Sequence, residues 1–313
     1  MRIAILDLGT NTFNLLIAEE GRHKKPVFIY KRELPVEIGK GGIHKGYITA
    51  EAIERAIAAL HTHRKTITEY NVDNYYAFAT SAVRDAANGK EFAERIRVET
   101  GIEIKIVTGE EEAQWIYEGV KYASVLGENA SVIMDIGGGS TEFIIANQDI
   151  IFWKRSYPLG VTRLYEMFFP SDPMSKEKQE QVEKYITDML ADMFEAADIY
   201  KPLELIGSSG SFDSFAQIII SRAGGNYEPQ NGFDFPMDEF NKLYDDLLIS
   251  TLEQRLKMNG LIQMRAPMFV YSAILAKLVL ERLSIKRMKL SHFALKEGIA
   301  GYLLTHEKIK PRE

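Results

Sequence analysis

The sequence contains no cysteine, which excludes disulfide bonds, thiolate metal sites and cysteine nucleophiles. It also lacks a long apolar run, because its most apolar stretch, residues 269–280, contains Lys277 and is too short to cross a bilayer. The formal net charge of −6 provides no overall attraction for nucleic acid or a membrane surface. The opening MRIAILDLG shows no signal-peptide cleavage pattern. These absences predict a cytoplasmic protein without nucleic-acid or membrane partners.

Basic side chains are gathered in a few places, and an anionic substrate would have to use them. The chain has 313 residues and 46% hydrophobic residues, enough for two domains that each bury a core. Given the negative net charge, an anion would need local basic patches. The candidate clusters are Arg22/Lys24/Lys25, Lys31/Arg32 and Lys286/Arg287/Lys289. The alternative for each cluster is an ordinary solvated surface.

Two segments of the chain repeat one pattern. Residues 5–19 read ILDLGTNTFNLLIAE, and residues 133–147 read IMDIGGGSTEFIIAN. Each is an apolar run that ends in Asp, followed by a turn of small residues and a second apolar run, which is typical of a β-hairpin. Aligned without gaps, the two segments share an Ile, an Asp, a Gly, and a final Ile-Ala pair. The repetition predicts two related halves that face each other.

The two turns have the composition of phosphate-binding loops. Glycine lets backbone N–H groups point into a concavity, where they bind phosphate oxygens. The predicted phosphate-binding residues are Gly9, Thr10, Asn11, Gly137, Gly138, Gly139 and Ser140. Each first strand ends in an aspartate, Asp7 or Asp135, whose hard oxygen atoms suit Mg²⁺. The alternative is a pair of purely structural turns.

The rest of the chain has an α/β pattern. Further strands are predicted near 26–34, 75–80, 102–107 and 150–156, and helices near 49–70, 89–99 and 110–123. Beyond residue 174 helices dominate, at 174–199, 211–223, 237–252, 267–283 and from 293 onward, with a long loop at 224–235. We therefore expect domains at 1–124 and 125–313, with the active-site cleft between them.

Three more positions could take part in chemistry. Arg84, in ATSAVRDAAN, follows a helix start where an anion could bind, although a simple cap with an exposed arginine is the alternative. Three glutamates open a helix in TGEEEA, where the helix dipole accounts for two of them. The third, directly before Ala113, could orient and deprotonate a water molecule. Glu142 either places a metal ion or its water, or is a solvent-facing strand residue.

Taken in order, four motifs resemble the exopolyphosphatase / guanosine pentaphosphate phosphohydrolase family. They are DLGTNTF at 7–13, ATSAVRDAAN at 79–88, GEEEA at 109–113 and DIGGGSTE at 135–142, with weaker agreement in YPLGVTRL at 157–164. The family belongs to the sugar-kinase, chaperone and actin-like superfamily. The resemblance therefore implies two actin-like (ribonuclease H-like) domains, and this chain is similar to the short, two-domain members.

The resemblance also implies an activity and roles for individual residues. The implied reaction is Mg²⁺-dependent release of terminal phosphate from polyphosphate and/or guanosine pentaphosphate, in a protein that could form a homodimer. Glu112 is implied as the catalytic base and Arg84 as a contact to the phosphates. Asp7, Asp135 and Glu142 are implied around Mg²⁺.

The second half of the chain departs from the family pattern, which leaves the choice of substrate open. Pro267 replaces an acidic residue, Lys296 replaces an arginine, and the loop at 207–215 has serines where glycine or threonine is usual. Two alternatives also stay open: a phosphotransferase (kinase) of the same superfamily, and a non-enzymatic nucleotide or alarmone sensor.

Overall fold

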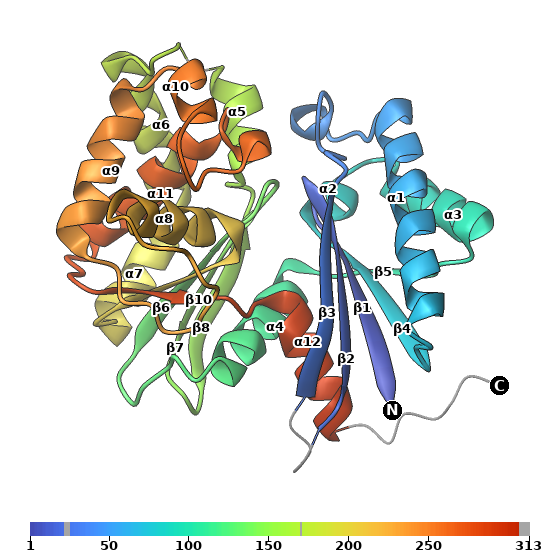
Figure 1. Cartoon of the computed structure of the whole chain (residues 1–313). Helices are drawn as coiled ribbons and strands as arrows, with labels where there is room; N and C mark the ends of the chain where they lie inside the picture. The colour runs from blue at the N-terminus through green and yellow to red at the C-terminus, as the bar shows by residue number, and fades with distance from the viewer. Residues whose placement is uncertain (22–25, 170, 307–313) are drawn as a thin grey trace. The chain divides into compact units, whose positions relative to one another are not determined.

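The computed structural model describes residues 1–21, 26–169 and 171–306, and the chain divides into two compact units (Figure 1). Unit 1 comprises Met1–Tyr122 and Ala294–Glu313, and unit 2 comprises Ala123–Phe293. The sequence analysis placed the first boundary at residue 124 and assigned everything beyond it to the second domain. The structure differs at the carboxy-terminal end, where helix α12 (Leu295–His306) is part of unit 1.

Unit 1 contains a five-stranded mixed sheet in the order β3-β2-β1-β4-β5. The first three strands are antiparallel, and β4 and β5 run parallel to β1. The strands are β1 (Arg2–Leu8), β2 (Thr12–Glu20), β3 (Pro26–Pro35), β4 (Asn74–Ala79) and β5 (Ile104–Ile106).

Helices cover both faces of this sheet, which explains why β1 is apolar on both sides. Side chains alternate between the faces of a strand. Ala4, Leu6 and Leu8 pack into a core with α1 (Ala50–Glu69) and α3 (Gly89–Thr100). Ile3 and Ile5, also fully buried, lie on the opposite face, which α12 and α4 (Gly109–Tyr122) cover (Figure 1). Asp7 shares that second face by the same alternation.

Helix α12 is part of unit 1 because glycines let it pack closely on α4. A Cβ atom on Gly298 would lie 2.0 Å from the carbonyl oxygen of Trp115, and one on Gly119 would lie 2.1 Å from that of Ala294. Only hydrogen fits at either position. The backbones of the two helices can therefore approach each other.

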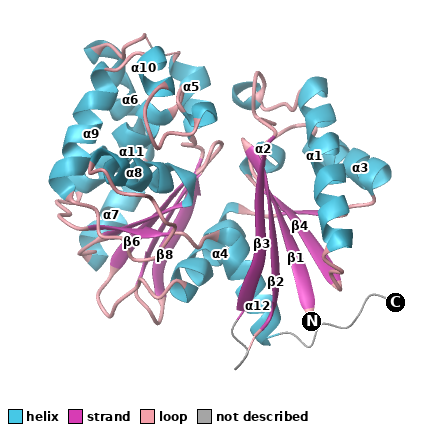
Figure 2. Cartoon of the chain, in the orientation of Figure 1, coloured by secondary structure: helices cyan, strands magenta, loops and turns pink. Residues whose placement is uncertain are grey.

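Unit 2 repeats the topology of unit 1, with the strand order β10-β9-β6-β7-β8. The strands β6, β7 and β8 are antiparallel like β1, β2 and β3, and β9 and β10 run parallel to β6 like β4 and β5 to β1 (Figure 2). The strands are β6 (Ser131–Ile136), β7 (Thr141–Ala146), β8 (Ile151–Tyr157), β9 (Leu205–Ser208) and β10 (Met288–Ser291). The internal duplication and the predicted class, two actin-like α/β domains, are confirmed.

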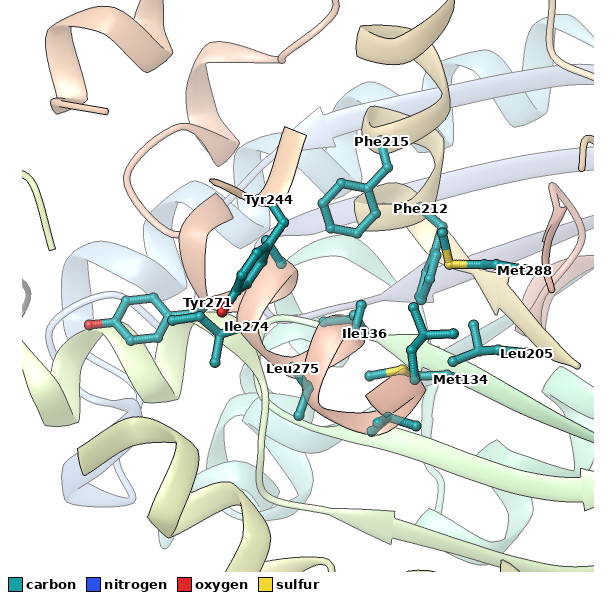
Figure 3. Close-up of a cluster of buried hydrophobic side chains, with 14 of the residues drawn as sticks. Met134, Ile136, Leu205, Phe212, Phe215, Tyr244, Tyr271, Ile274, Leu275 and Met288 are labelled. Atoms are coloured by element: carbon teal, nitrogen blue, oxygen red, sulfur yellow. The ribbon is translucent and has the colours of Figure 1, made fainter. Parts of the chain in front are cut away.

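Unit 2 contains a larger set of helices, of which α7 and α8 contact the sheet. They are α5 (Val161–Phe168), α6 (Lys176–Met189), α7 (Ala191–Tyr200), α8 (Ser209–Arg222), α9 (Met237–Ile249), α10 (Leu252–Leu256) and α11 (Phe269–Arg282). Figure 3 shows part of the core they enclose, where Phe212 and Phe215 of α8 lie near Met134 and Ile136 of β6. The helix predicted at 174–199 is divided into α6 and α7 at Leu190, and β9 and β10 were not predicted. Among the described residues, no helix combines the length and the apolar character needed to span a membrane.

Candidate active site

In unit 1 the predicted site residues lie at the carboxyl ends of the parallel strands. Asp7 is near the end of β1, Arg84 ends the short helix α2 (Ser81–Arg84) that follows β4, and Glu112 is in the first turn of α4, which follows β5. The carboxyl ends of parallel strands share one edge of a sheet, the edge at which open α/β sheets bind ligands. The topology thus brings together residues that are far apart in the sequence.

The two predicted turns have the same backbone geometry. The N–H of Gly9 donates to the carbonyl oxygen of Thr12 at 3.0 Å, and the N–H of Gly137 donates to that of Ser140 at 3.0 Å. Both turns connect antiparallel strands, so the β-hairpins are confirmed. The phosphate-binding role of these turns stays a prediction.

In the turn of unit 2, the carbonyl groups of the three glycines are directed at α5. The oxygen of Gly137 accepts from the N–H of Val161 at 3.0 Å, and that of Gly138 accepts from the N–H of Thr162 at 2.9 Å. The oxygen of Gly139 accepts from Nε of Arg163 at 3.1 Å. A trans peptide points its C=O and the following N–H in opposite directions. The N–H groups that follow these carbonyls therefore point away from α5.

The N–H groups of Gly138 and Gly139 donate no hydrogen bond within the described part of the chain. The turn in unit 1 is anchored by its carbonyls in the same way. The oxygen of Asn11 accepts from the N–H groups of Val36 and Glu37 at 2.9 and 2.8 Å, and that of Thr10 accepts from Gly39 at 3.2 Å. Both turns thus use their acceptors to hold their shape, an arrangement suited to presenting donors to an anion.

Arg84 and Glu112 form an ion pair within unit 1. Nη1 of Arg84 lies 2.6 Å from Oε2 of Glu112 and also donates to the carbonyl oxygen of Val107 at 3.3 Å. The side chain of Arg84 is 19% exposed and that of Glu112 9% exposed. Arg84 is therefore not the exposed arginine of the structural alternative. A partly buried, charge-assisted bond of this length fixes the orientation of both groups.

The other two glutamates of the GEEEA motif have different environments. Glu111 forms a reciprocal capping box with Thr108, because its Oε2 accepts from the Thr108 N–H at 2.9 Å and its own N–H donates to the Thr108 hydroxyl at 3.1 Å. A hydrogen bond from Lys105, with the bond from Thr108, lowers the pKa of Glu111 below its usual value. Glu110 is exposed. Of the three glutamates, only Glu112 is buried with a guanidinium partner.

Asp135 is held by two serine hydroxyls at the end of β9. Ser208 donates to Oδ2 at 2.7 Å, and Ser209 donates to Oδ1 at 2.6 Å. Asp135 is 5% exposed, so burial alone would disfavour its charge, and hydroxyl donors on both oxygens offset that cost. Sequence reasoning noted these serines only as a departure from the family pattern and gave them no role.

Glu142 is also buried. It is 1% exposed and accepts from the hydroxyl of Ser156 at 2.7 Å, so the solvent-facing alternative is wrong. Its register partner on β6 is Asp135, which places the two carboxylates side by side on one face of the sheet. Mg²⁺ usually takes one or two protein carboxylates and fills its other positions with water and substrate phosphate. Asp135 and Glu142 fit that pattern.

Asp7 accepts a hydrogen bond from a different kind of side chain than Asp135 does. Its Oδ2 accepts from the amide of Asn14, its register partner on β2, at 3.2 Å. The predicted metal set thus has one member in unit 1 and two in unit 2. Within the described residues, no group of three or more Asp, Glu, His or Cys side chains forms a ready metal cage.

Three members of the basic clusters, Lys31, Arg287 and Lys289, pair with glutamates. Arg22, Lys24 and Lys25 lie outside the described residues. Lys31 pairs with the fully buried Glu297 at 2.9 Å, and Lys296, the residue that replaces the family's arginine, lies 3.6 Å from the same carboxylate. In the third cluster, Arg287 and Lys289 pair with Glu204 at 3.3 and 3.1 Å.

Comparison with known proteins agrees with this geometry. The model of the Ppx/GppA phosphatase family matches residues 16–307. The chain belongs to the Ppx/GppA phosphatase family. It is 36% identical to an exopolyphosphatase of known structure from Cytophaga hutchinsonii, with a TM-score of 0.94 over 97% of this chain and 98% of that one.

Two further relatives are similar over most of their length. The structure of the Aquifex aeolicus member is 26% identical, with a TM-score of 0.81 and 99% of each chain covered. Exopolyphosphatase 1 of Mycobacterium tuberculosis is 26% identical over 300 residues, covering 96% of this chain and 87% of that protein. The family predicted from the motifs is confirmed.

Proposed function

We propose that this Ppx/GppA family member is an exopolyphosphatase, which releases terminal orthophosphate from inorganic polyphosphate. The relatives named above from Cytophaga hutchinsonii and Mycobacterium tuberculosis are exopolyphosphatases, and the matches cover nearly the whole chain. Guanosine pentaphosphate is the second candidate substrate, because it ends in the same phosphoanhydride linkage.

The observation that carries the proposal is the ion pair between the half-buried Arg84 and the buried Glu112. Hydrolysis of a phosphoanhydride needs a carboxylate that orients water and takes its proton, and a cation that stabilises charge on the phosphoryl oxygens. The two groups lie 2.6 Å apart at the ligand-binding edge of unit 1. Arg84 holds Oε2 of Glu112, so the carboxylate is oriented before substrate arrives.

The two glycine turns would supply the second part of the chemistry. Their N–H groups are proposed to bind phosphate oxygens, with Gly9, Thr10 and Asn11 acting in unit 1 and Gly137, Gly138, Gly139 and Ser140 in unit 2. Fixed backbone donors need no reorganisation as charge develops, which is the main source of rate enhancement in phosphoryl transfer.

Asp135 and Glu142 of unit 2 are proposed to hold Mg²⁺, and Asp7 of unit 1 is a further proposed metal residue. When bound, the ion would neutralise phosphate charge and help to align the substrate. The two buried carboxylates and their serine partners would keep that site in shape whether or not substrate is present.

The test is phosphate release from long-chain polyphosphate, guanosine pentaphosphate and ATP by the full chain with Mg²⁺. Glu112→Gln keeps the shape of the side chain and removes the base, so we expect a loss of about 10²–10⁴-fold in kcat. Glu111→Gln is the matched control, because Glu111 lies in the same helical turn and only caps it. Its kcat should stay within about threefold of wild type.

The outcomes separate the alternatives. The proposal is supported if wild type and Glu111→Gln release phosphate from polyphosphate and Glu112→Gln does not. Release from guanosine pentaphosphate alone would reassign the substrate. No release from any of the three by folded protein would refute the hydrolase, and binding of ATP or a guanosine polyphosphate without turnover would favour a kinase or a sensor.

A further inference from the structure

The serines at the end of β9 occupy an unusual backbone position beside Asp135. Ser208 is the last residue of β9, is fully buried, and is the register partner of Asp135 on β6. Ser209 has a φ of +67°, the left-handed region that a residue with a Cβ rarely adopts. Such a conformation costs free energy and persists where the surroundings require it. Here it accompanies a 2.6 Å bond from the Ser209 hydroxyl to Asp135.

The pattern of donors shows what the serines do to the carboxylate. Each oxygen of Asp135 receives one hydroxyl, from Ser208 on Oδ2 and from Ser209 on Oδ1. Two donors on separate oxygens stop rotation of the carboxylate about its Cβ–Cγ bond. Hydroxyls are neutral, so unlike lysine or arginine they leave the negative charge of Asp135 available to a cation.

We propose that Ser208 and Ser209 are positioning residues that orient Asp135 for a divalent cation. The inference rests on the proposed function in that it assigns Asp135 to the Mg²⁺ site. Outer-shell partners of this kind orient the ligand, and their loss typically costs about 10–100-fold in metal affinity or activity. Ser208 and Ser209 act through Asp135, to which both hydroxyls donate.

Three substitutions at residue 209 separate the hydroxyl from the backbone conformation. Ser209→Ala removes the hydroxyl and keeps a Cβ at positive φ. Ser209→Gly removes the hydroxyl and tolerates positive φ without strain. Ser209→Asn restores a donor and is among the residues that best accept this region. Ser211→Ala is the matched control, since Ser211 lies in the same first part of α8, is buried, and bonds the hydroxyl of Ser272 instead of Asp135.

The first measurement is Mn²⁺ binding to the substrate-free full chain, by electron paramagnetic resonance or calorimetry, with Mn²⁺ as the probe for a hard divalent cation. We expect Ser209→Ala and Ser209→Gly to weaken Mn²⁺ binding about tenfold or more. Ser208→Ala should behave likewise, Ser209→Asn should recover at least part of the affinity, and Ser211→Ala should match wild type. Thermal melts identify any variant that fails to fold, and Ser209→Gly should be at least as stable as Ser209→Ala.

The second measurement is phosphate release from polyphosphate as a function of Mg²⁺ concentration. The serine variants should need about tenfold more Mg²⁺ for half-maximal rate, with a smaller change in KM for polyphosphate. The inference would be overturned if folded Ser209→Gly bound Mn²⁺ as tightly as wild type, or if wild type itself bound no measurable Mn²⁺. If wild type binds Mn²⁺ and the serine variants lose that binding, but neither wild type nor any variant releases phosphate, then the positioning role stands and the proposed hydrolase fails.

Discussion

Gly160 provides a direct test of whether the shape of the turn in unit 2 matters. It precedes α5 with φ of −70° and ψ of 149°, an extended conformation that alanine adopts easily. Backbone strain therefore does not prevent substitution. A Cβ atom at residue 160, however, would lie 2.3 Å from the carbonyl carbon and oxygen of Gly138 and 2.3 Å from the carbonyl carbon of Gly139.

The magnitude follows from that distance. Non-bonded carbon atoms sit about 3.5 Å apart or more, so the turn and α5 must separate by about 1 Å in Gly160→Ala. Overpacking of this kind typically costs about 1–3 kcal/mol of unfolding free energy. The hydrogen bonds from Val161, Thr162 and Arg163 that hold the carbonyls of the turn would also lengthen. A 1 Å displacement of positioned groups costs about 10²-fold in rate.

The assay compares Gly160→Ala with Gly127→Ala in the same unit. A Cβ on Gly127 would have no heavy atom within 4 Å, so this control should change neither activity nor the unfolding free energy by more than about 0.5 kcal/mol. Urea denaturation gives the stability and phosphate release from polyphosphate gives the rate. Two results would refute the argument that the contact with α5 sets the shape of the turn. One is a wild-type kcat in Gly160→Ala, and the other is an equally large loss of kcat in Gly127→Ala.

Three further predictions concern buried charges. Burial alone would raise the pKa of Glu297, but Lys296 and Lys31 hold it below its usual value, so Glu297 stabilises the fold above pH about 4.5 and loses that effect as pH falls through its lowered pKa. In urea denaturation at pH 7, Glu297→Gln should lower the unfolding free energy by about 2 kcal/mol, less than for a fully buried pair because Lys31 is half exposed. Glu94→Gln, in an exposed pair with Arg97, should leave the unfolding free energy nearly unchanged, and equal losses in the two variants would contradict this reasoning. Burial lowers the pKa of His63 in the folded chain below its value of about 6.5 in the unfolded chain. The unfolding free energy should therefore fall as pH drops below about 6.5, and His63→Gln should flatten that pH dependence. Asp135→Asn should weaken Mn²⁺ binding more than Asp7→Asn, and the reverse order in calorimetry would place the main metal ligand in unit 1.

Local patterns explain what could be predicted from the sequence. The two hairpins were predictable because an apolar strand, an aspartate and a glycine turn occur together within fifteen residues and occur twice. The roles of the glutamates in GEEEA were partly predictable. The helix dipole favours glutamates in a first turn, so some of the three were expected to stabilise the helix, and Glu111 caps it. The ion pair of Glu112 with Arg84 was not predictable from spacing alone, because it depends on β4 and β5 being neighbours.

Features set by long-range contacts could not be predicted. Strands β9 and β10 have four residues each, too short for a periodic signal, and each is followed directly by helix-forming or polar sequence. The place of α12 in unit 1 depends on close contacts of Gly119 and Gly298, which look like ordinary helix interruptions in sequence. Ser208 and Ser209 gain a partner only because β9 pairs with β6, so no local motif could link them to Asp135.

The two units share one backbone topology, but the side chains at equivalent positions of their sheets differ. In unit 2 the row across the sheet reads Ser208, Asp135, Glu142 and Ser156 in register, so two carboxylates stand between two hydroxyls. The equivalent row in unit 1 reads Phe78, Asp7, Asn14 and Glu33. An amide replaces the second carboxylate beside the aspartate, and an apolar ring replaces the hydroxyl. Adjacent paired carboxylates favour a divalent cation more than a carboxylate beside an amide does. On the proposed function, the two turns would bind phosphate with one shared geometry, and the paired carboxylates would give unit 2 the better cation site.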